Sequence, residues 1–197
     1  MPSRVWVANQ ELLAADLNSY VQQQVVATFA NTADRATAMP SPTNGAMAWI
    51  QAASPYLCVY NGSAWVTLTP QAALVATQET TTSAAYVNLA TVGPAVTLET
   101  GARALVTVSA LSANAGSGGE QASYMAPAVS GATTRAANDD QALRTTQSAN
   151  AGTLQASFQT LMTGLTPGVN TFTAQYKTTS GSTGSFARRN LTVVALP

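Results

Sequence analysis

Few residues in this sequence could carry chemistry, and their types and spacing argue against catalysis. The chain has one cysteine, Cys58, and no histidine that could take the proton from its thiol. Cys58 lies between Leu57 and Val59 in an apolar run, so we expect a packed, unreactive thiol. The serine and threonine hydroxyls have no recognisable base partner. We therefore predict no catalytic residue and no enzymatic activity.

Candidate ligand-binding residues are equally sparse. Asp139-Asp140 is the only adjacent acidic pair, whereas a calcium loop needs more carboxylates at alternating positions. The glycines within 116–119 do not follow a strand and open a helix, as those of a phosphate-binding loop would. Arg188-Arg189 could form ion pairs across a subunit contact, or could only keep an edge strand soluble. We expect neither a metal nor a cofactor.

The composition excludes several classes of partner. The 197 residues include eight basic and eight acidic side chains, and only 8% are charged, against about 25% in an ordinary soluble domain. Eight scattered basic residues cannot form the surface that tracks phosphates in a nucleic-acid-binding protein. No run of eighteen apolar residues exists, so we expect no membrane span. A neutral, charge-poor surface favours self-association, which suggests a component of a larger assembly.

The first predicted element is a helix over residues 9–29. Apolar side chains recur in it every four residues and form one stripe. That stripe could pack on its own domain or on a partner, and both readings stay open because the neighbouring segment is small. If the helix docks on a partner, the expected contact residues are Trp6, Leu13, Leu17, Val21 and Val25.

The segment 46–69 predicts a three-stranded antiparallel meander. Asn61-Gly62 is a strong two-residue hairpin turn, because both central positions favour positive φ. The tryptophans and tyrosines of this segment could form a sugar platform, but core packing of a small module is the better explanation. Helix and meander together make a first unit over residues 1–69. Residues 70–85 are expected to be a linker with a first strand.

The remaining residues, 86–197, predict a domain built of β-strands alone. Alternating apolar and polar segments, separated by glycine- and proline-containing turns, are typical of a sandwich or jelly roll. The expected strands are 86–89, 95–99, 103–111, 121–129, 154–162, 170–178 and 186–196. The last strand is apolar on both faces, and only one face of a sandwich strand meets the core, so another subunit would cover the second. The expected trimer-interface residues are Leu191, Val193, Val194 and Leu196.

Three segments resemble virion structural proteins of tailed phages, especially phages of actinobacteria. The opening combines Trp6 with the run Glu-Leu-Leu-Ala-Ala-Asp-Leu-Asn-Ser-Tyr at 11–20, although Leu13 stands where the family often has a threonine cap. The stretches 33–49 and 57–65 are similar to a Pro-Thr-x-Gly-Met, Tyr-x-Gly-x-x-Trp module of phage tail and head appendages. The segment 161–196 looks like appendage domains with a trimeric jelly roll of the tumour-necrosis-factor-like type.

This resemblance implies a mainly β, non-enzymatic, homotrimeric component on the surface of the virion, of the head-fibre, neck or minor-tail kind. Its N-terminal part would attach to capsid, neck or tail proteins, and its C-terminal jelly roll would face outward. An alternative is a receptor-binding protein that recognises host cell-surface glycans through Tyr124, residues 116–120 and Asp139-Asp140. A depolymerase would need a paired acid and base in one cleft, and the carboxylates show no such grouping. Neither nucleic acid nor membrane is an expected partner.

Overall fold

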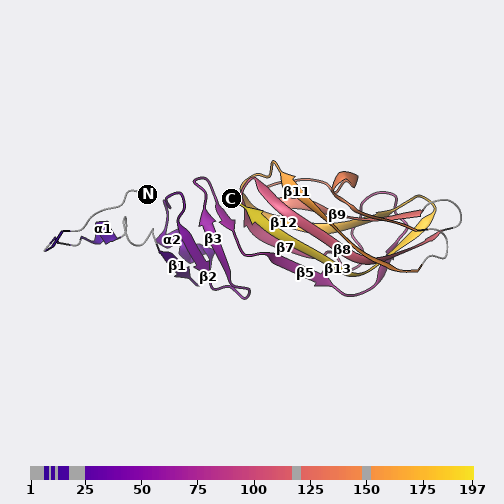
Figure 1. Ribbon diagram of the computed structural model, residues 1–197, viewed down its shortest axis with the longest axis horizontal. Coiled ribbons are helices and arrows are strands. Elements are labelled where there is room, and N and C mark those ends of the chain that lie inside the picture. The colour runs from indigo at the N-terminus through magenta and orange to yellow at the C-terminus, as the bar shows by residue number, and fades with distance from the viewer. Residues whose placement is uncertain (1–6, 9, 12, 18–24, 117–120, 148–151) are drawn as a thin grey trace.

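The protein consists of a small β unit and an elongated β-sandwich, which follow each other along the long axis of the molecule (Figure 1). The computed structural model describes residues 7–8, 10–11, 13–17, 25–116, 121–147 and 152–197. Strands dominate these residues, so the predicted mainly β class is confirmed.

The predicted N-terminal helix is wrong at its end. Within 9–29, the described residues form a single helical turn, α1 (Ala14–Leu17), and then strand β1 (Val26–Phe29). β1 pairs in parallel with β2 (Met47–Ile50), from Val26 opposite Met47 to Phe29 opposite Ile50. Backbone pairing with a neighbouring strand outweighs a four-residue apolar period, and β-branched residues in this segment favour the extended state. Residues 18–24 lie outside the described part.

The predicted three-stranded meander is confirmed. Its strands β2, β3 (Tyr56–Tyr60) and β4 (Trp65–Thr67) pair antiparallel in that order, and β1 extends the sheet beyond β2. Gly62 adopts a φ of 94° in the turn between β3 and β4. A helix that the sequence analysis missed, α2 (Thr32–Ala38), joins β1 to β2, and the Asn31 side chain caps it by accepting from the Asp34 N–H at 2.9 Å.

Two sheets pack face to face in the larger unit and share one apolar core. The first sheet has the order β10-β9-β12-β7, and the second has the order β11-β8-β13-β5, with β6 also paired to β13. Their bounds are β5 (Gln71–Val75), β6 (Glu79–Thr81), β7 (Ala95–Thr100), β8 (Arg103–Gly116), β9 (Gln121–Gly131), β10 (Leu143–Gln147), β11 (Leu154–Thr163), β12 (Gly168–Thr178) and β13 (Ser182–Leu196).

Eight strands of the sandwich, all except β6, pair in a nested order. β5 pairs with β13, β7 with β12, β8 with β11 and β9 with β10, all antiparallel. The chain therefore folds as one long hairpin that wraps around the core. This arrangement places residues 71–75 beside the closing strand, which agrees with the first strand expected within residues 70–85.

Two details of the strand prediction differ from the structure. Residues 86–89 form no strand, and only Val87 bridges to Tyr176. β10 was missed, because its sequence Leu-Arg-Thr-Thr-Gln holds a single apolar residue. A third feature that was not predicted is a bulge in β13: the register to β8 shifts between Ala187 and Asn190, and Arg188 adopts a φ of 47°.

The bulge turns Arg189 into the interior, where its side chain is fully buried. Its guanidinium lies 3.1 Å from the Glu79 carboxylate and donates to the carbonyls of Thr77 and Thr91, each at 3.3 Å. Glu79 in turn accepts from the N–H and hydroxyl of Thr91. Charged hydrogen bonds thus tie residues 77–91 to the closing strand.

Candidate functional site

Cys58, the one cysteine of the chain, lies in the interior of the small β unit. The Cys58 side chain is fully buried, its thiol donates to the Ala48 carbonyl at 3.3 Å, and burial raises its pKa. Within the described ranges, no three histidine, cysteine, aspartate or glutamate side chains cluster as metal ligands would. The same ranges contain no helix that is long and apolar enough to cross a membrane.

The residues expected to dock on a partner are only partly described. Leu13 and Val25 are both more than half exposed, and Val25 precedes β1 rather than lying on a helix. Leu17 ends α1. Trp6 and Val21 lie outside the described residues, so the continuous apolar stripe stays a prediction.

The four residues expected at a subunit interface fall on opposite faces of β13. Leu191 and Val193 are fully buried in the chain's own core. Val194 and Leu196 point away from that core and are half-buried. Only these latter two therefore lie where another copy of the chain could contact them.

Val194 belongs to a group of outward-facing, uncharged residues on this sheet, which we call the uncharged face; it begins one row beyond Arg103. Cross-strand pairing places Leu161, Leu105 and Val194 in one row on this surface, and Leu161 is 50% exposed. The row on one side contains Thr163, Arg103 and Leu196. The rows on the other side contain threonine, serine, glutamine, asparagine and alanine, and Leu74 on the edge strand is also exposed. The uncharged face consists of Gln155, Ser157, Gln159, Leu161, Leu105, Thr107, Ser109, Leu111, Asn190, Thr192, Val194, Ala72 and Leu74.

A buried ion pair joins the small β unit to the sandwich. Arg35 of α2 is 4% exposed and donates two hydrogen bonds to the Glu99 carboxylate of β7, at 2.8 and 2.6 Å. The guanidinium also lies 4.3 Å from the centre of the Trp65 ring and 3.2 Å from the sulfur of Cys58. Such a bidentate pair fixes orientation as well as distance, so it holds the two units in one relative position.

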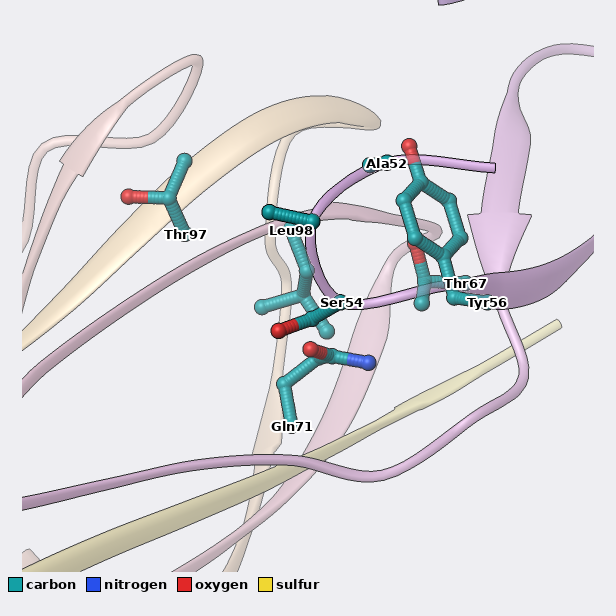
Figure 2. A pocket seen from close by; sticks show the side chains of 8 residues that line it. Ala52, Ser54, Tyr56, Thr67, Gln71, Thr97 and Leu98 are labelled. Atoms are coloured by element: carbon teal, nitrogen blue, oxygen red, sulfur yellow. The ribbon is translucent and has the colours of Figure 1, made fainter. Parts of the chain in front are cut away.

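Beside this ion pair, the junction contains a pocket of about 230 Å³. Figure 2 shows Tyr56 and Thr67 on one side of it, Thr97 on the other, and Ser54, Gln71 and Leu98 between them. Both units contribute to its walls, which consist of Ala52, Ala53, Ser54, Tyr56, Thr67, Gln71, Thr97 and Leu98. None of these side chains carries a charge. Burial, with the nearby Glu99 charge adding to it, raises the pKa of Tyr56.

Two of the residues proposed as glycan contacts meet on the outer face of the other sheet. The Lys177 ammonium lies 4.6 Å from the Tyr124 ring, 5.0 Å from the Tyr86 ring and 2.6 Å from the Asp139 carboxylate. The Tyr86 hydroxyl donates to Asp139 at 3.1 Å. Lys177 lowers the pKa of Asp139. Asp140 is exposed in the neighbouring turn η2 (Asp139–Gln141), and residues 117–120 lie outside the described part.

Within this cluster the charges and hydrogen bonds are already satisfied by one another. Lys177 occupies the space between the two tyrosine rings, and Asp139 neutralises it. The cluster therefore attaches residues 86 and 139 to the sheet.

No model of a known protein family matches the chain, and no curated protein matches its sequence.

The sequence analysis missed the junction, which depends on residues far apart in the chain. Arg35 and Glu99 are separated by 64 positions. The sequence contained one signal: in a chain with so few charged residues, a charge next to apolar residues suggests a specific ion pair. Glu99 lies next to Leu98 near the end of its strand, which is not the polar run that is typical of a solvated charge, whereas Arg35 lies among polar residues.

Proposed function

We propose that this protein is a non-enzymatic structural component of a tailed-phage virion, and that it assembles as a homotrimer through the uncharged face. Its N-terminal part would attach to capsid, neck or tail proteins, and the sandwich would project from the particle. The observation that carries the proposal is a sheet surface on which an apolar row borders several rows of uncharged polar side chains, with Arg103 only at its end.

The chemistry of the uncharged face suits contact with identical copies. Burying an exposed leucine or valine completely contributes about 1.5–3 kcal/mol, and the row Leu161, Leu105 and Val194 is half-buried or exposed in the single chain. Threonine, serine and glutamine around this row offer hydrogen bonds without the desolvation cost of an ion. Association would also cover exposed apolar side chains that otherwise favour aggregation.

The nested strand pairing supports a finer assignment of the sandwich. Eight strands that pair first with last, second with seventh, and so on inward have the connectivity of a jelly roll. This order, together with the resemblance of segment 161–196, supports a jelly roll of the tumour-necrosis-factor-like type. The resemblance of the opening and of segment 33–65 to phage appendage modules supports the virion assignment.

The oligomeric state of the purified chain tests the proposal. Light scattering coupled to size exclusion should give three times the chain mass of 20.2 kDa. Leu105→Arg places a charge in the apolar row of the uncharged face and should yield monomers. Thr173→Arg makes the matched change on the outer face of the opposite sheet and should leave the trimer intact.

Two results would count against the proposal. A monomer at the highest soluble concentration removes its physical basis, and dissociation by Thr173→Arg but not by Leu105→Arg places the contact elsewhere. The virion assignment has its own readout, because mass spectrometry of purified particles from the source must detect the chain.

A further inference from the structure

The turn between β3 and β4 contains Asn61-Gly62, one of the two Asn-Gly pairs in the sequence; the other is Asn44-Gly45. In such a pair the glycine nitrogen can attack the carbonyl carbon of the asparagine side chain, because glycine has no side chain to hinder the approach. A bond forms from this nitrogen to Cγ, the N–H proton passes through water to the side-chain amide, and that amide leaves as ammonia. Water then opens the cyclic imide to aspartate or isoaspartate.

The two pairs differ in whether the attacking nitrogen is available. The Gly45 N–H donates to the Tyr60 carbonyl at 2.7 Å. A hydrogen-bonded N–H must give up its acceptor before it can react, which costs free energy. Gly62 is exposed, and its N–H makes no hydrogen bond to any described residue. The nitrogen of Gly62 is therefore the more available nucleophile.

The carbonyl group of Asn61 is also prepared for attack. Its Oδ1 atom accepts three hydrogen bonds: from the Ser63 N–H at 3.1 Å, from the Ser63 hydroxyl at 2.9 Å and from the Ala64 N–H at 3.0 Å. Attack on Cγ moves negative charge onto this oxygen. Donors that already point at an atom stabilise the charge that develops there, as in an oxyanion hole.

From the free nucleophile and the polarised carbonyl we propose that Asn61 is a site of spontaneous deamidation, and that the folded chain converts Asn61 in preference to Asn44. The leaving amide nitrogen faces the sandwich, where it lies 3.2 Å from the position that a Cβ atom on Gly101 would take. The product adds one negative charge to a chain whose formal net charge is zero, and it adds this charge where the two units meet.

Peptide mass spectrometry on the folded full chain measures both sites in one sample. The chain is incubated at neutral and at mildly alkaline pH, and the acid formed at positions 61 and 44 is followed with time. Asn61 should react about three- to tenfold faster than Asn44, which is the factor that one hydrogen bond of ordinary strength corresponds to. In the chain unfolded by denaturant, the two sites should react at comparable rates, because neither turn persists.

Two further readouts identify the chemical route. The rate at Asn61 should rise with pH, because the glycine nitrogen must lose its proton as it attacks. Isoaspartate should appear beside aspartate, since water can open either carbonyl of the imide. Direct hydrolysis of the side chain would produce aspartate alone.

Two variants locate the cause in the turn. Ser63→Ala removes one donor to the Asn61 carbonyl and keeps the backbone N–H, so it should slow the reaction at Asn61 about two- to tenfold. Asn44 in the same molecule should keep its rate, and thermal unfolding checks that the variant is folded. Thr43→Ala removes a hydroxyl beside the other pair and is the matched control, in which Asn61 should react as in the wild type.

The inference is overturned if Asn61 stays intact, if Asn44 reacts as fast as Asn61 in the folded chain, or if Ser63→Ala leaves the rate at Asn61 unchanged or raises it. These outcomes are independent of the proposed assembly, because the whole turn lies within one chain. A monomeric protein could deamidate at Asn61, and a trimer could keep Asn61 intact.

Discussion

The Arg35–Glu99 ion pair provides the sharpest test of how the two units are held together. Arg35 is 4% exposed and the Glu99 side chain is 14% exposed. Water hydrates neither charge well, so each charge is stabilised mainly by the other. Removing one member of a buried pair leaves the second charge without compensation, which typically costs about 3–5 kcal/mol. For a chain of this length, 1 kcal/mol corresponds to roughly 2–4 °C in Tm. We therefore expect Arg35→Met and Glu99→Leu each to lower the Tm by about 6–20 °C.

The double variant Arg35→Met/Glu99→Leu decides whether the pair is the cause. It removes both charges together, so it should be more stable than either single variant. Thermal unfolding followed by circular dichroism measures all three against the wild type. Arg103→Met, which removes an exposed arginine, should shift the Tm by no more than about 2 °C. The reasoning would be refuted if the single variants had the Tm of the wild type. It would also be refuted if the decrease in Tm of the double variant equalled the sum of the two single decreases.

Three further predictions follow from buried or paired groups. Cys58 should react with iodoacetamide only after unfolding, since the folded thiol is inaccessible and burial raises its pKa; rapid labelling at neutral pH would contradict this. Asp139→Asn should lower stability at pH 7 by at most about 1 kcal/mol. Lys177 lowers the pKa of Asp139 in the folded state, so the stabilisation by this ion pair is present above the ordinary pKa of 3.8 and is lost as the pH falls below it. Denaturant titrations should therefore show the difference in unfolding free energy between wild type and variant shrinking in acid. A difference that stays constant with pH would exclude the ion pair as its source. Arg189→Met should lower the Tm clearly more than the same change at the exposed neighbour Arg188, and equal shifts would show that Glu79 and its hydrogen bonds contribute little.

The strands of the sandwich were largely predictable because their side chains alternate. β12 is the clearest case: Phe172, Ala174 and Tyr176 face the core, and the threonine, glutamine and lysine residues between them face outward. A period of two leaves little choice of structure when one face must be buried. The same reasoning found the hairpin turn at Gly62, where positive φ is required.

The prediction failed where local pattern and long-range pairing compete. Val25 and Phe29 fit a helical period, yet Phe29 lies in a strand because Ile50 pairs with it. β10 carries almost no local signal, and its pairing with β9 alone makes it a strand. Contacts of this kind join residues that are far apart in the sequence, so a short stretch of neighbouring residues does not reveal which of them form strands.

The sequence by itself determined the β class of this protein, its alternating core and its scarcity of charge, because these depend on residue type and on a period of two. Only the tertiary structure decided which faces of the strands stay open, that Arg35 meets Glu99, and that Thr67 lines a pocket between two units. Those features arise from pairings across dozens of residues, where the free energy depends on what surrounds a side chain after folding and not on its neighbours in the chain.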